Sequence, residues 1–440
     1  MTDSISLVNT NYASNPMNLM GKPRPEGISS PAVRPQLGLA SLGAYLGCYM
    51  PETKVYLVDA VLENLAPEET AKRALNEAPG AIGVSSTYHN LKEALGVLRS
   101  VKKDAPDTIT ILGGPGARSL FDIAGGKDVE YVNYAVMGDG ELDLERILEK
   151  ASIPKETQFT QDFVSLNILP SAYDLNPETE RPYLDMFDVE GYFKANRELG
   201  FHGRPSDGKL LTDYTCKGCG WRRCAHCSTE TPWRGRSPKR LGRDLQNIKD
   251  FYGENCELFI VDDNPTTGPD SWIIETYRTL GESGFPWHTQ IRVDEALKKC
   301  GGKLPQIMAD SGCTSVSIGA ESGSQKVLDA LKKGITPQQT LDAVKAFGDA
   351  GIKTSMFLMY NCPEEDKSDL DRTLEMARKA IETGNIESVL AFEYVPIPGS
   401  RAYRQRRPGG NIKQGEKEYF RDKLLEIGRG KAAVIPGTYK

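Results

Sequence analysis

Residues 214–228, which read YTCKGCGWRRCAHCS, are the stretch from which the rest of this chain can be interpreted. Four of the nine cysteines crowd into it, at positions 216, 219, 224 and 227. A secreted disulfide-bonded protein would spread its cysteines in pairs, but nine is an odd number and four share one short loop. Reduced thiols that bind a metal therefore fit better.

Two kinds of metal site compete for these thiols. Two Cys-x-x-Cys pairs could close around one zinc ion, yet zinc modules usually separate such pairs by about 12 to 20 residues. Here four residues lie between Cys219 and Cys224. Thiolates packed this closely favour an iron–sulfur cluster, which three cysteines can hold with one iron left open for a ligand.

The sequence on either side of the cysteines alternates short apolar runs with helical patterns. The run at 210–215 comes directly before the loop, so its thiols would emerge at the carboxyl end of a strand, where barrels place active sites. Six such runs predict a (β/α)6 partial barrel over residues 206–400, followed by a C-terminal extension over 401–440. The expected strands are 210–215, 258–261, 288–293, 315–318, 354–359 and 389–395.

Residues 1–150 show the same alternation and predict an N-terminal α/β domain with a doubly wound parallel sheet. Each apolar run ends in small or polar residues, and open sheets bind ligands at these carboxyl ends. Residues 151–205 lose the alternation and contain five prolines, which predicts a linker with some local structure. The expected strands are 5–8, 55–58, 81–84, 108–112 and 134–137.

Composition narrows the function classes. The 440 residues carry 54 Lys and Arg against 60 Asp and Glu, a formal charge of -6, which gives no general reason to bind nucleic acid. The longest apolar stretch, residues 37–50, is too short to cross a bilayer, and the N-terminus lacks a signal-peptide pattern. We therefore expect a cytoplasmic protein with no membrane partner.

The motifs resemble those of cobalamin-binding radical S-adenosylmethionine (SAM) enzymes, and the resemblance covers most of the chain. The family's cysteine motif is Cys-x3-Cys-x2-Cys, and residues 218–227 match it with one extra residue in the first gap. Residues 361–365 depart from the family's pattern, because the family usually has glycine where Asn361 and Glu364 stand. This difference leaves the backbone geometry of that segment open. Further matches follow in the family's order at 234–238, 261–264, 290–294, 318–325 and 396–400.

The resemblance implies a 4Fe-4S cluster held by Cys219, Cys224 and Cys227. Cys219 is preferred as the first ligand because the family's first cysteine often follows a glycine. Cys216 is the alternative to Cys219, or a fourth ligand that would close the open iron. His226 occupies the family's aromatic position, where stacking beside the adenine is implied rather than metal binding.

The resemblance also implies that SAM binds the open iron, where one electron cleaves it to a 5'-deoxyadenosyl radical. Arg292 is a candidate for binding the SAM carboxylate, and Glu321 and Ser322 for hydrogen bonding to its ribose or amino group. Gly319 belongs to the same motif. In a competing interpretation, Glu321 is a carboxylate at a helix N-terminus, favoured there by the helix dipole.

The first 150 residues resemble the family's cobalamin-binding domain. Glycines at the strand ends would let the backbone approach the flat corrin, although a plain doubly wound sheet also uses glycine turns. The Asp-x-His-x-x-Gly motif of many cobalamin domains is absent, so we expect no histidine on the lower face of cobalt, and His89 fits a packing role. The candidate contacts are Ser86, Thr87, Gly113, Gly114, Pro115, Gly138, Gly140 and Glu141.

The implied reaction is a cobalamin-dependent radical SAM methyl transfer. One SAM would convert cobalamin to methylcobalamin, and another would generate the radical that prepares an unactivated carbon, or phosphorus, of a small-molecule or peptide substrate. One rival is a cobalamin-dependent radical SAM enzyme that cyclises, oxidises or rearranges its substrate. A rival from another class is a zinc-bearing binding protein. Catalytic residues stay unassigned, because Asp262 and Asp263 could be acid–base groups or could order a loop.

Each turnover would need an external one-electron donor such as flavodoxin or ferredoxin. Basic residues cluster around the cysteine loop and could attract such a donor or an anionic substrate, although a basic run is usually a solvated face. These residues are Arg222, Arg223, Arg234, Arg236, Lys239 and Arg240.

Overall fold

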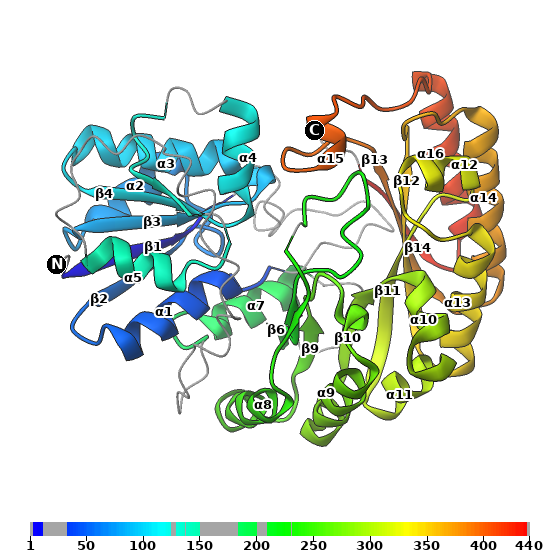
Figure 1. The fold of residues 1–440 in the computed structure, drawn as a ribbon, viewed down its shortest axis with the longest axis horizontal. Helices are drawn as coiled ribbons and strands as arrows, with labels where there is room; N and C mark the ends of the chain where they lie inside the picture. Colours follow the sequence, from blue (N-terminus) through cyan, green and yellow to red (C-terminus); the bar gives the residue numbers. More distant parts are fainter. Residues whose placement is uncertain are drawn as a thin grey trace. The chain divides into compact units, whose positions relative to one another are not determined.

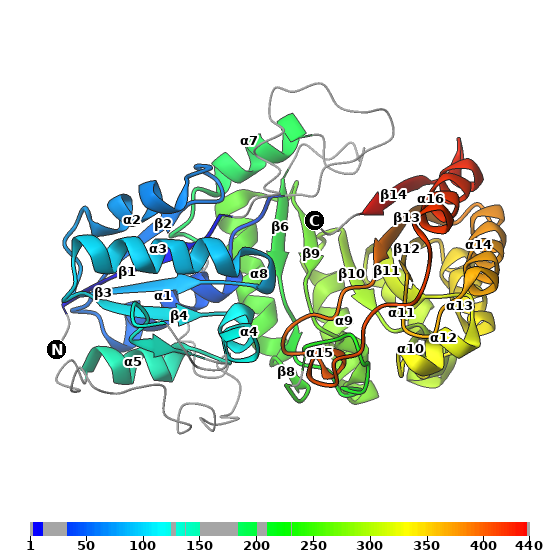
Figure 2. The ribbon, with the colours of Figure 1, turned by 90° about the horizontal axis from the view of Figure 1, so that it is seen from above.

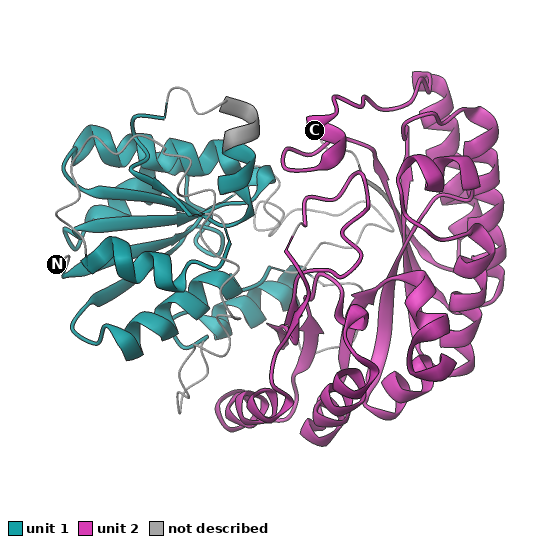
Figure 3. Cartoon of the chain, viewed as in Figure 1, with its two compact units in different colours: residues 1–22, 30–208 teal, residues 23–29, 209–440 magenta. Residues whose placement is uncertain are grey.

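The computed structural model describes residues 3–11, 33–124, 129–136, 138–149, 184–199, 209–229 and 231–437. They form two compact α/β units (Figures 1 and 2), which Figure 3 colours separately and which we describe one at a time. Unit 1 contains the described residues up to Leu199, and unit 2 those from Lys209 onward. None of the described helices is both long and apolar enough to cross a membrane.

Unit 1 is built on a parallel sheet in the order β2-β1-β3-β4-β5. The strand order reverses between β1 and β3, the point at which open sheets of this kind bind ligands. All five predicted strands are present, and Met137 of the last predicted run lies outside the described residues. The strands are β1 (Ser4–Asn9), β2 (Lys54–Asp59), β3 (Ala81–Ser85), β4 (Ile109–Gly113) and β5 (Tyr134–Ala135).

Helices cover both faces of this sheet (Figure 1). Leu91 and Leu98 of α3 are buried in a core that includes Val84 and Leu112 of the central strands. Their spacing of seven residues puts both on one helical face. The helices are α1 (Leu37–Tyr49), α2 (Pro67–Leu75), α3 (Leu91–Asp104), α4 (Pro115–Ala124) and α5 (Glu141–Glu149).

The last part of the predicted linker contains α7 (Val189–Leu199), which belongs to unit 1. Tyr192 of α7 is fully buried, and its hydroxyl donates a hydrogen bond of 2.6 Å to Asp59. Asn9 donates to the same carboxylate at 2.8 Å. Burial raises the pKa of Asp59, and these hydrogen bonds act against the rise. Residues 151–183 lie outside the described part of the chain.

Unit 2 is a parallel sheet in the order β14-β13-β12-β11-β10-β9-β6 that forms a partial barrel. Six strands are those predicted, and the seventh, β14 (Ala433–Gly437), comes from the predicted C-terminal extension and pairs with β13. Its five residues include Pro436, which weakened the strand signal. The six are β6 (Leu210–Asp213), β9 (Glu257–Ile260), β10 (Trp287–Ile291), β11 (Cys313–Glu321), β12 (Lys353–Tyr360) and β13 (Ile386–Glu393).

The helices of unit 2 cover the outer face of this sheet (Figure 2). Side chains alternate along a strand, so Met356 and Leu358 of β12 are buried on one face while Phe357 and Met359 are half-buried on the other. The inner face is thereby left to line a cavity. The helices are α8 (Pro238–Tyr252), α9 (Asp270–Ser283), α10 (Val293–Lys298), α11 (Leu304–Asp310), α12 (Gln325–Ala330), α13 (Pro337–Asp349), α14 (Lys367–Glu382), α15 (Arg401–Arg404) and α16 (Gln414–Gly428).

Candidate active site

The cysteine loop, residues 216–229, follows β6 at the carboxyl end of the first barrel strand. A short antiparallel pair, β7 (Cys216–Lys217) with β8 (Arg234–Gly235), closes its base. Cys216 lies in this pair and is 1% exposed, whereas Cys219 and Cys224 are half-buried and Cys227 is exposed. The fold therefore separates the four thiols into one buried thiol and three accessible ones.

Each accessible thiol has its own N–H donor. The sulfur of Cys219 is 3.7 Å from Nδ2 of Asn264, that of Cys224 is 3.8 Å from Nη1 of Arg292, and that of Cys227 accepts from the backbone of Thr229 at 3.4 Å. Such donors stabilise thiolate ligands. Among the described residues, no three His, Cys, Asp or Glu side chains are grouped to share a single metal ion. Three accessible thiols, each with its own N–H donor, fit an iron–sulfur cluster, which three cysteines can hold.

Asp262 and Asp263, which the sequence left unassigned, both hold the loop. Asp262 is buried just after β9 and accepts hydrogen bonds from the backbone and the hydroxyl of Thr215, the former at 2.7 Å. Burial raises the pKa of Asp262 to about 7, although these hydrogen bonds act to lower it. Asp263 accepts from the backbone of Gly218 at 2.8 Å and from the hydroxyl of Thr229 at 3.2 Å. One carboxylate thus joins the two ends of the segment that carries the three accessible thiols.

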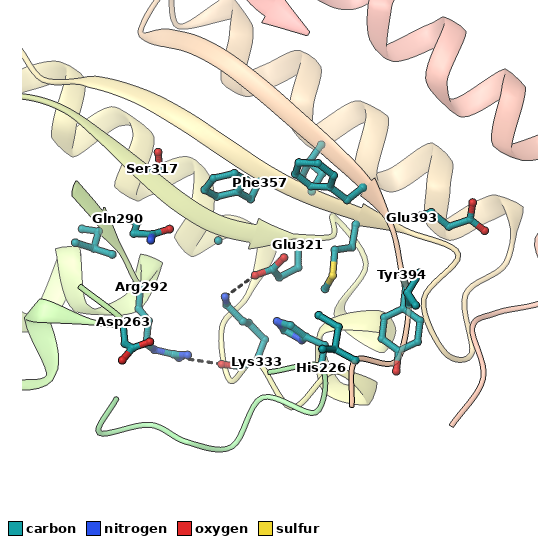
Figure 4. Close-up of a pocket in the computed structure, with 17 residues that line it drawn as sticks. His226, Asp263, Gln290, Arg292, Ser317, Glu321, Lys333, Phe357, Glu393 and Tyr394 are labelled. Atoms are coloured by element: carbon teal, nitrogen blue, oxygen red, sulfur yellow. Dashed lines mark hydrogen bonds and ion pairs between the residues drawn. The ribbon is translucent and has the colours of Figure 1, made fainter. Parts of the chain in front are cut away.

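A cavity of 360 Å³ opens at the inner face of the barrel beside this loop (Figure 4). The strand ends of β10 and β11 contribute Arg292, Gly319 and Glu321 to its wall, and the cysteine loop contributes His226. The sequence therefore predicted four residues that the structure brings together. Position at the carboxyl ends of neighbouring parallel strands explains the convergence.

Lys333, which sequence reasoning missed, completes the charged end of this cavity. Its ammonium lies 2.6 Å from Oε1 of Glu321, and both side chains are more than nine-tenths buried. Arg292 donates to the carbonyl of Lys333 at 2.9 Å, pairs with Asp294 at 3.0 Å, and lies over the ring of Trp221 at 4.4 Å. In the sequence, Lys-Lys-Gly has the appearance of a solvated turn, and only tertiary structure reveals the buried partner.

Glu321 is ionised in spite of its burial. Burial alone would raise its pKa, but Lys333, together with His226 and Arg292, brings the pKa of Glu321 below the usual value. Its backbone is left-handed, with φ at 60°, beside a register shift in β11. Helix α12 begins four residues later, at Gln325, so the buried pair with Lys333 describes this carboxylate better than a helix terminus does.

Ser322 has a different environment from its neighbour. It is fully buried, its hydroxyl lies 3.0 Å from that of Thr373, and it accepts a hydrogen bond of 3.1 Å from the backbone of Ser324. It is not among the residues that line the cavity. In this structure Ser322 joins β11 to α14 and α12, so its expected contact with a ligand lacks the geometry that Glu321 has.

Two buried polar atoms at the cavity have no hydrogen-bond partner in the described part of the chain. They are Nδ1 of His226 and the hydroxyl of Tyr394. Burial lowers the pKa of His226, so the imidazole is neutral, and burial raises the pKa of Tyr394 to about 12. Burying an unpaired polar atom is costly, so these two atoms mark places where a ligand would complete the structure.

In unit 1, the turns after β3 and β4 pack closely together. The backbone of Gly116 donates to the carbonyl of Ser86 at 2.9 Å, and the hydroxyl of Ser86 donates to the carbonyl of Gly113 at 3.0 Å. A Cβ on Gly114, whose φ is 78°, would lie 2.4 Å from the Ser86 carbonyl oxygen, whereas a Cβ on Gly113 would meet nothing closer than 4.0 Å. Of these two glycines, only Gly114 is required by the turn itself.

The other predicted cobalamin contacts of unit 1 lie at the same edge of the sheet. The backbone N–H of Thr87 donates a hydrogen bond of 2.6 Å to Oδ1 of Asn90, and the hydroxyl of Thr87 donates to the same oxygen. Pro115 opens α4, Gly138 has φ at 116°, and Gly140 precedes α5. His89 makes an edge contact with Tyr88, and burial lowers its pKa.

Two buried oxygens at this edge lack hydrogen-bond partners among the described residues. Oε1 of Glu141 accepts from Ser41 at 2.7 Å, but Oε2 has no partner. The hydroxyl of Thr10, directly after β1, is also unpartnered, and the sequence analysis did not identify it. Thr10 stands at the switch point between β1 and β3, so its position in the strand order is the signal that could have found it.

The basic residues around the cysteine loop do not form one solvated face. Arg236 is 3% exposed and its Nη1 lies 3.0 Å from both carboxylate oxygens of Asp213. Arg236 also pairs with Asp244, as Arg240 does. Arg222 and Arg223 are exposed. The interpretation of Arg236 as part of an anion-attracting surface is therefore wrong, because this guanidinium anchors the end of β6.

The two positions where family glycines are missing have left-handed backbone conformations. Asn361 has φ at 61° and Glu364 has φ at 67°. Such values are unfavourable for non-glycine residues, asparagine least so. Asn361 is held by a 3.0 Å hydrogen bond from its Nδ2 to Glu393. The chain therefore keeps the glycine geometry without the glycines.

This chain is similar to several known proteins. Residues 214–377 match the Radical SAM superfamily. An uncharacterized methyltransferase of Pyrococcus horikoshii is 26% identical, over 84% of this chain and 78% of its own length. Cytidylyl-2-hydroxyethylphosphonate methyltransferase of Streptomyces wedmorensis is 24% identical, over 87% of this chain and 80% of its own.

A solved structure shares the fold of the whole chain. It is the radical SAM methyltransferase TsrM of Kitasatospora setae with cobalamin and a 4Fe-4S cluster bound, with a TM-score of 0.67 and 12% identity, covering 100% of this chain and 92% of TsrM. The match over residues 214–377 includes the cysteine loop, Arg292 and Glu321. Residues 214–377 of this chain are therefore a radical SAM domain.

Proposed function

We propose that this enzyme is a cobalamin-dependent radical SAM methyltransferase. It would move a methyl group from SAM, with cobalamin as carrier, to an unactivated carbon or phosphorus of a small-molecule or peptide substrate. The observation that carries the proposal is the set of three accessible thiols, each with its own N–H donor, beside a cavity with a buried Arg292–Glu321–Lys333 group. The names of the relatives and the fold shared with TsrM support methyl transfer.

In this proposal Cys219, Cys224 and Cys227 hold a 4Fe-4S cluster, and Cys216 does not. Cys216 is 1% exposed within the β7–β8 pair, whereas the other three thiols are half-buried or exposed and are therefore accessible to a cluster. When bound, the cluster and SAM supply a carbon-centred radical. An external one-electron donor such as flavodoxin or ferredoxin would reduce the cluster.

The chain's own residues would bind and orient SAM and exclude water from it. The Arg292 guanidinium would face the SAM carboxylate, and ionised Glu321 the SAM amino group or ribose. Neutral His226, with its unpaired Nδ1, would lie beside the adenine. These are the residues whose charge or unsatisfied atoms line the charged end of the cavity.

Unit 1 would hold cobalamin at the carboxyl edge of its sheet. Its strand order, the close turn at Ser86 and Gly114, and the unpaired oxygens of Thr10 and Glu141 fit a large ligand with many polar groups. Backbone that is free of side chains can approach a flat ring system closely. We assign no histidine to the lower face of cobalt.

The test is to purify and reconstitute the enzyme without oxygen and measure iron, sulfide, cobalamin and zinc. We expect one 4Fe-4S cluster and one cobalamin per chain. Incubation with methyl-labelled SAM and a low-potential reductant, which supplies the electrons that reduce cobalamin and the cluster, should then place the label on the bound cobalamin, a step that needs no substrate. Bound cobalamin that never takes the label, while 5'-deoxyadenosine still forms, would favour the rearranging enzyme. A colourless protein with one zinc per chain would contradict both.

A further inference from the structure

Trp221 of the cysteine loop is fixed on the turn that follows α12, residues 331–334. Its Nε1 donates a hydrogen bond of 3.2 Å to the carbonyl of Lys332. Its ring lies against Gly334, whose φ is 71° and on which a Cβ would come within 2.4 Å of the ring. Glycine is the residue that leaves room for the ring there. The side chain of Trp221 therefore has both a polar and a steric anchor in one turn.

The ring of Trp221 in turn supports Arg292. The Arg292 guanidinium lies over this ring at 4.4 Å, and its Nη2 donates to the carbonyl of Lys333 in the same turn (Figure 4). Its Nη1 lies 3.8 Å from the sulfur of Cys224, and Asp294 accepts from its edge. A guanidinium is a planar fork, so a ring on its face and acceptors at its edge together define its orientation. Removing the ring would leave the edge contacts without support on the face.

Trp221 also anchors one end of the longer gap in the cysteine motif, which has four residues where the family has three. Arg222, directly after Trp221, has a left-handed backbone with φ at 45°, which non-glycine residues rarely adopt. Beyond the gap, the backbone N–H of Ala225 donates at 2.8 Å to the carbonyl of Leu331, again in the turn after α12. The extra residue is thus taken up by a bend between two anchors on the same turn.

We propose that Trp221 is a positioning residue, which keeps the Arg292 guanidinium directed at the sulfur of Cys224 and at the SAM carboxylate. Trp221 is not among the described residues that line the cavity, so it acts through Arg292 rather than on SAM itself. The inference rests on the proposed function, because it takes Cys224 as a cluster ligand and Arg292 as a SAM-binding residue.

A displaced Arg292 has two measurable consequences. Nearby charge and hydrogen bonds to the ligand sulfurs set the reduction potential of a cluster, and a positive charge with an N–H donor favours the reduced form. Without the ring of Trp221, the potential should therefore fall. The same displacement removes the cation that would face the SAM carboxylate, so the affinity for SAM should fall together with the potential.

The test uses the full-length reconstituted enzyme and two measurements. Electron paramagnetic resonance at a series of fixed potentials gives the reduction potential of the cluster, and equilibrium dialysis without reductant gives the affinity for radiolabelled SAM. Trp221→Leu should lower the potential and weaken SAM binding about tenfold, the range of one cation–π contact. Trp221→Phe keeps a ring and should recover most of both effects. Trp233→Leu, the matched control, removes a ring that packs against Trp272 and should leave both values unchanged.

An Arg292→Gln background shows whether Trp221 acts through Arg292. In that background, Trp221→Leu should cause no further change in the potential or in SAM affinity. An equal further loss there would overturn the proposal, as would wild-type values in Trp221→Leu, or losses in Trp233→Leu as large as those in Trp221→Leu.

Iron content and circular dichroism show whether each variant is folded and holds its cluster. If Trp221→Leu does not, Trp221→Met, which fills more of the space with a flexible side chain, provides the same comparison. Neither measurement needs methyl transfer. An enzyme that gives the expected values but never methylates cobalamin would refute methyl transfer and leave the role of Trp221 established, whereas a wild-type chain that holds no cluster would contradict both.

Discussion

The ammonium of Lys333 lies 2.6 Å from the carboxylate of Glu321, and both are buried at the charged end of the cavity. Glu321 ends β11, and Lys333 lies twelve residues later in the sequence, shortly after the end of α12. The pair keeps Glu321 ionised in a place where burial would otherwise favour its protonated form. A carboxylate that stays charged at this position can bind a cationic or hydrogen-bond-donating part of a ligand.

Breaking this pair should destabilise unit 2. Lys333→Met leaves Glu321 buried without a partner and should lower the free energy of unfolding by about 3 kcal/mol. The double variant Lys333→Met, Glu321→Gln should recover most of that loss, because no unpaired charge remains. All four tryptophans (221, 233, 272 and 287) belong to unit 2, so denaturant unfolding followed by tryptophan fluorescence measures this unit. Equal losses in the single and double variants would contradict the account.

The four cysteines should separate into two classes. Cys219→Ala removes an accessible thiol that has an N–H donor, and the cluster should be lost from most chains. Cys216→Ala, the matched control, removes a buried thiol and should leave the cluster in place. Iron and sulfide content, with the electron paramagnetic resonance of the reduced cluster, provide the measurement. Loss of the cluster in Cys216→Ala but not in Cys219→Ala would exchange the two assignments.

Asp263 should determine how long the cluster survives. Asp263→Ala frees Gly218 and Thr229, which lie at either end of the thiol-bearing segment, and we expect an iron chelator to remove the cluster about tenfold faster. Asp310→Asn, on an exposed position of α11, is the control. The readout is the decay of the visible absorption of the cluster. If both variants decay at the wild-type rate, Asp263 has no positioning role.

Neighbouring glycines of unit 1 should respond differently to the same change. Gly114→Ala places a methyl group 2.4 Å from the Ser86 carbonyl oxygen at a positive φ and should destabilise unit 1 by roughly 1–3 kcal/mol. Gly113→Ala, with open space around it, should be tolerated. Retained cobalamin after gel filtration is the functional readout, and thermal unfolding by circular dichroism is the structural one. Equal effects of the two substitutions would refute the role assigned to Gly114.

Glu365 should make stability fall with rising pH. Burial raises its pKa to about 8, and Oε1 has no hydrogen-bond partner among the described residues. The pKa of a glutamate in the unfolded chain is about 4.3. The stabilisation that Glu365 contributes to the folded state is therefore complete below that pH and is lost as the pH rises through 8. Glu365→Gln should reduce the loss of unfolding free energy between about pH 6 and 8.5 by on the order of 2 kcal/mol.

The control for Glu365 is Glu282→Gln, on an exposed position of α9. Denaturant unfolding at the two pH values, again followed by tryptophan fluorescence, gives the comparison. Wild-type and Glu365→Gln enzymes that lose the same free energy between these pH values would show that Glu365 is already ionised in the folded chain.

The sequence by itself determined the parallel strands of both units, the place of the cysteine loop after the first barrel strand, and the convergence of His226, Arg292, Gly319 and Glu321. These features depend on local patterns: hydrophobic alternation fixes strands, and neighbouring strand ends must meet at one edge of a sheet.

Only the tertiary structure decided which of the four thiols is buried, that Lys333 pairs with Glu321, that Arg236 is an internal anchor, and that residues 433–437 form a seventh barrel strand. Each of these depends on partners distant in the sequence. Burial and ion pairing act through space, and short stretches such as Lys-Lys-Gly carry no local signal of the group that they will meet.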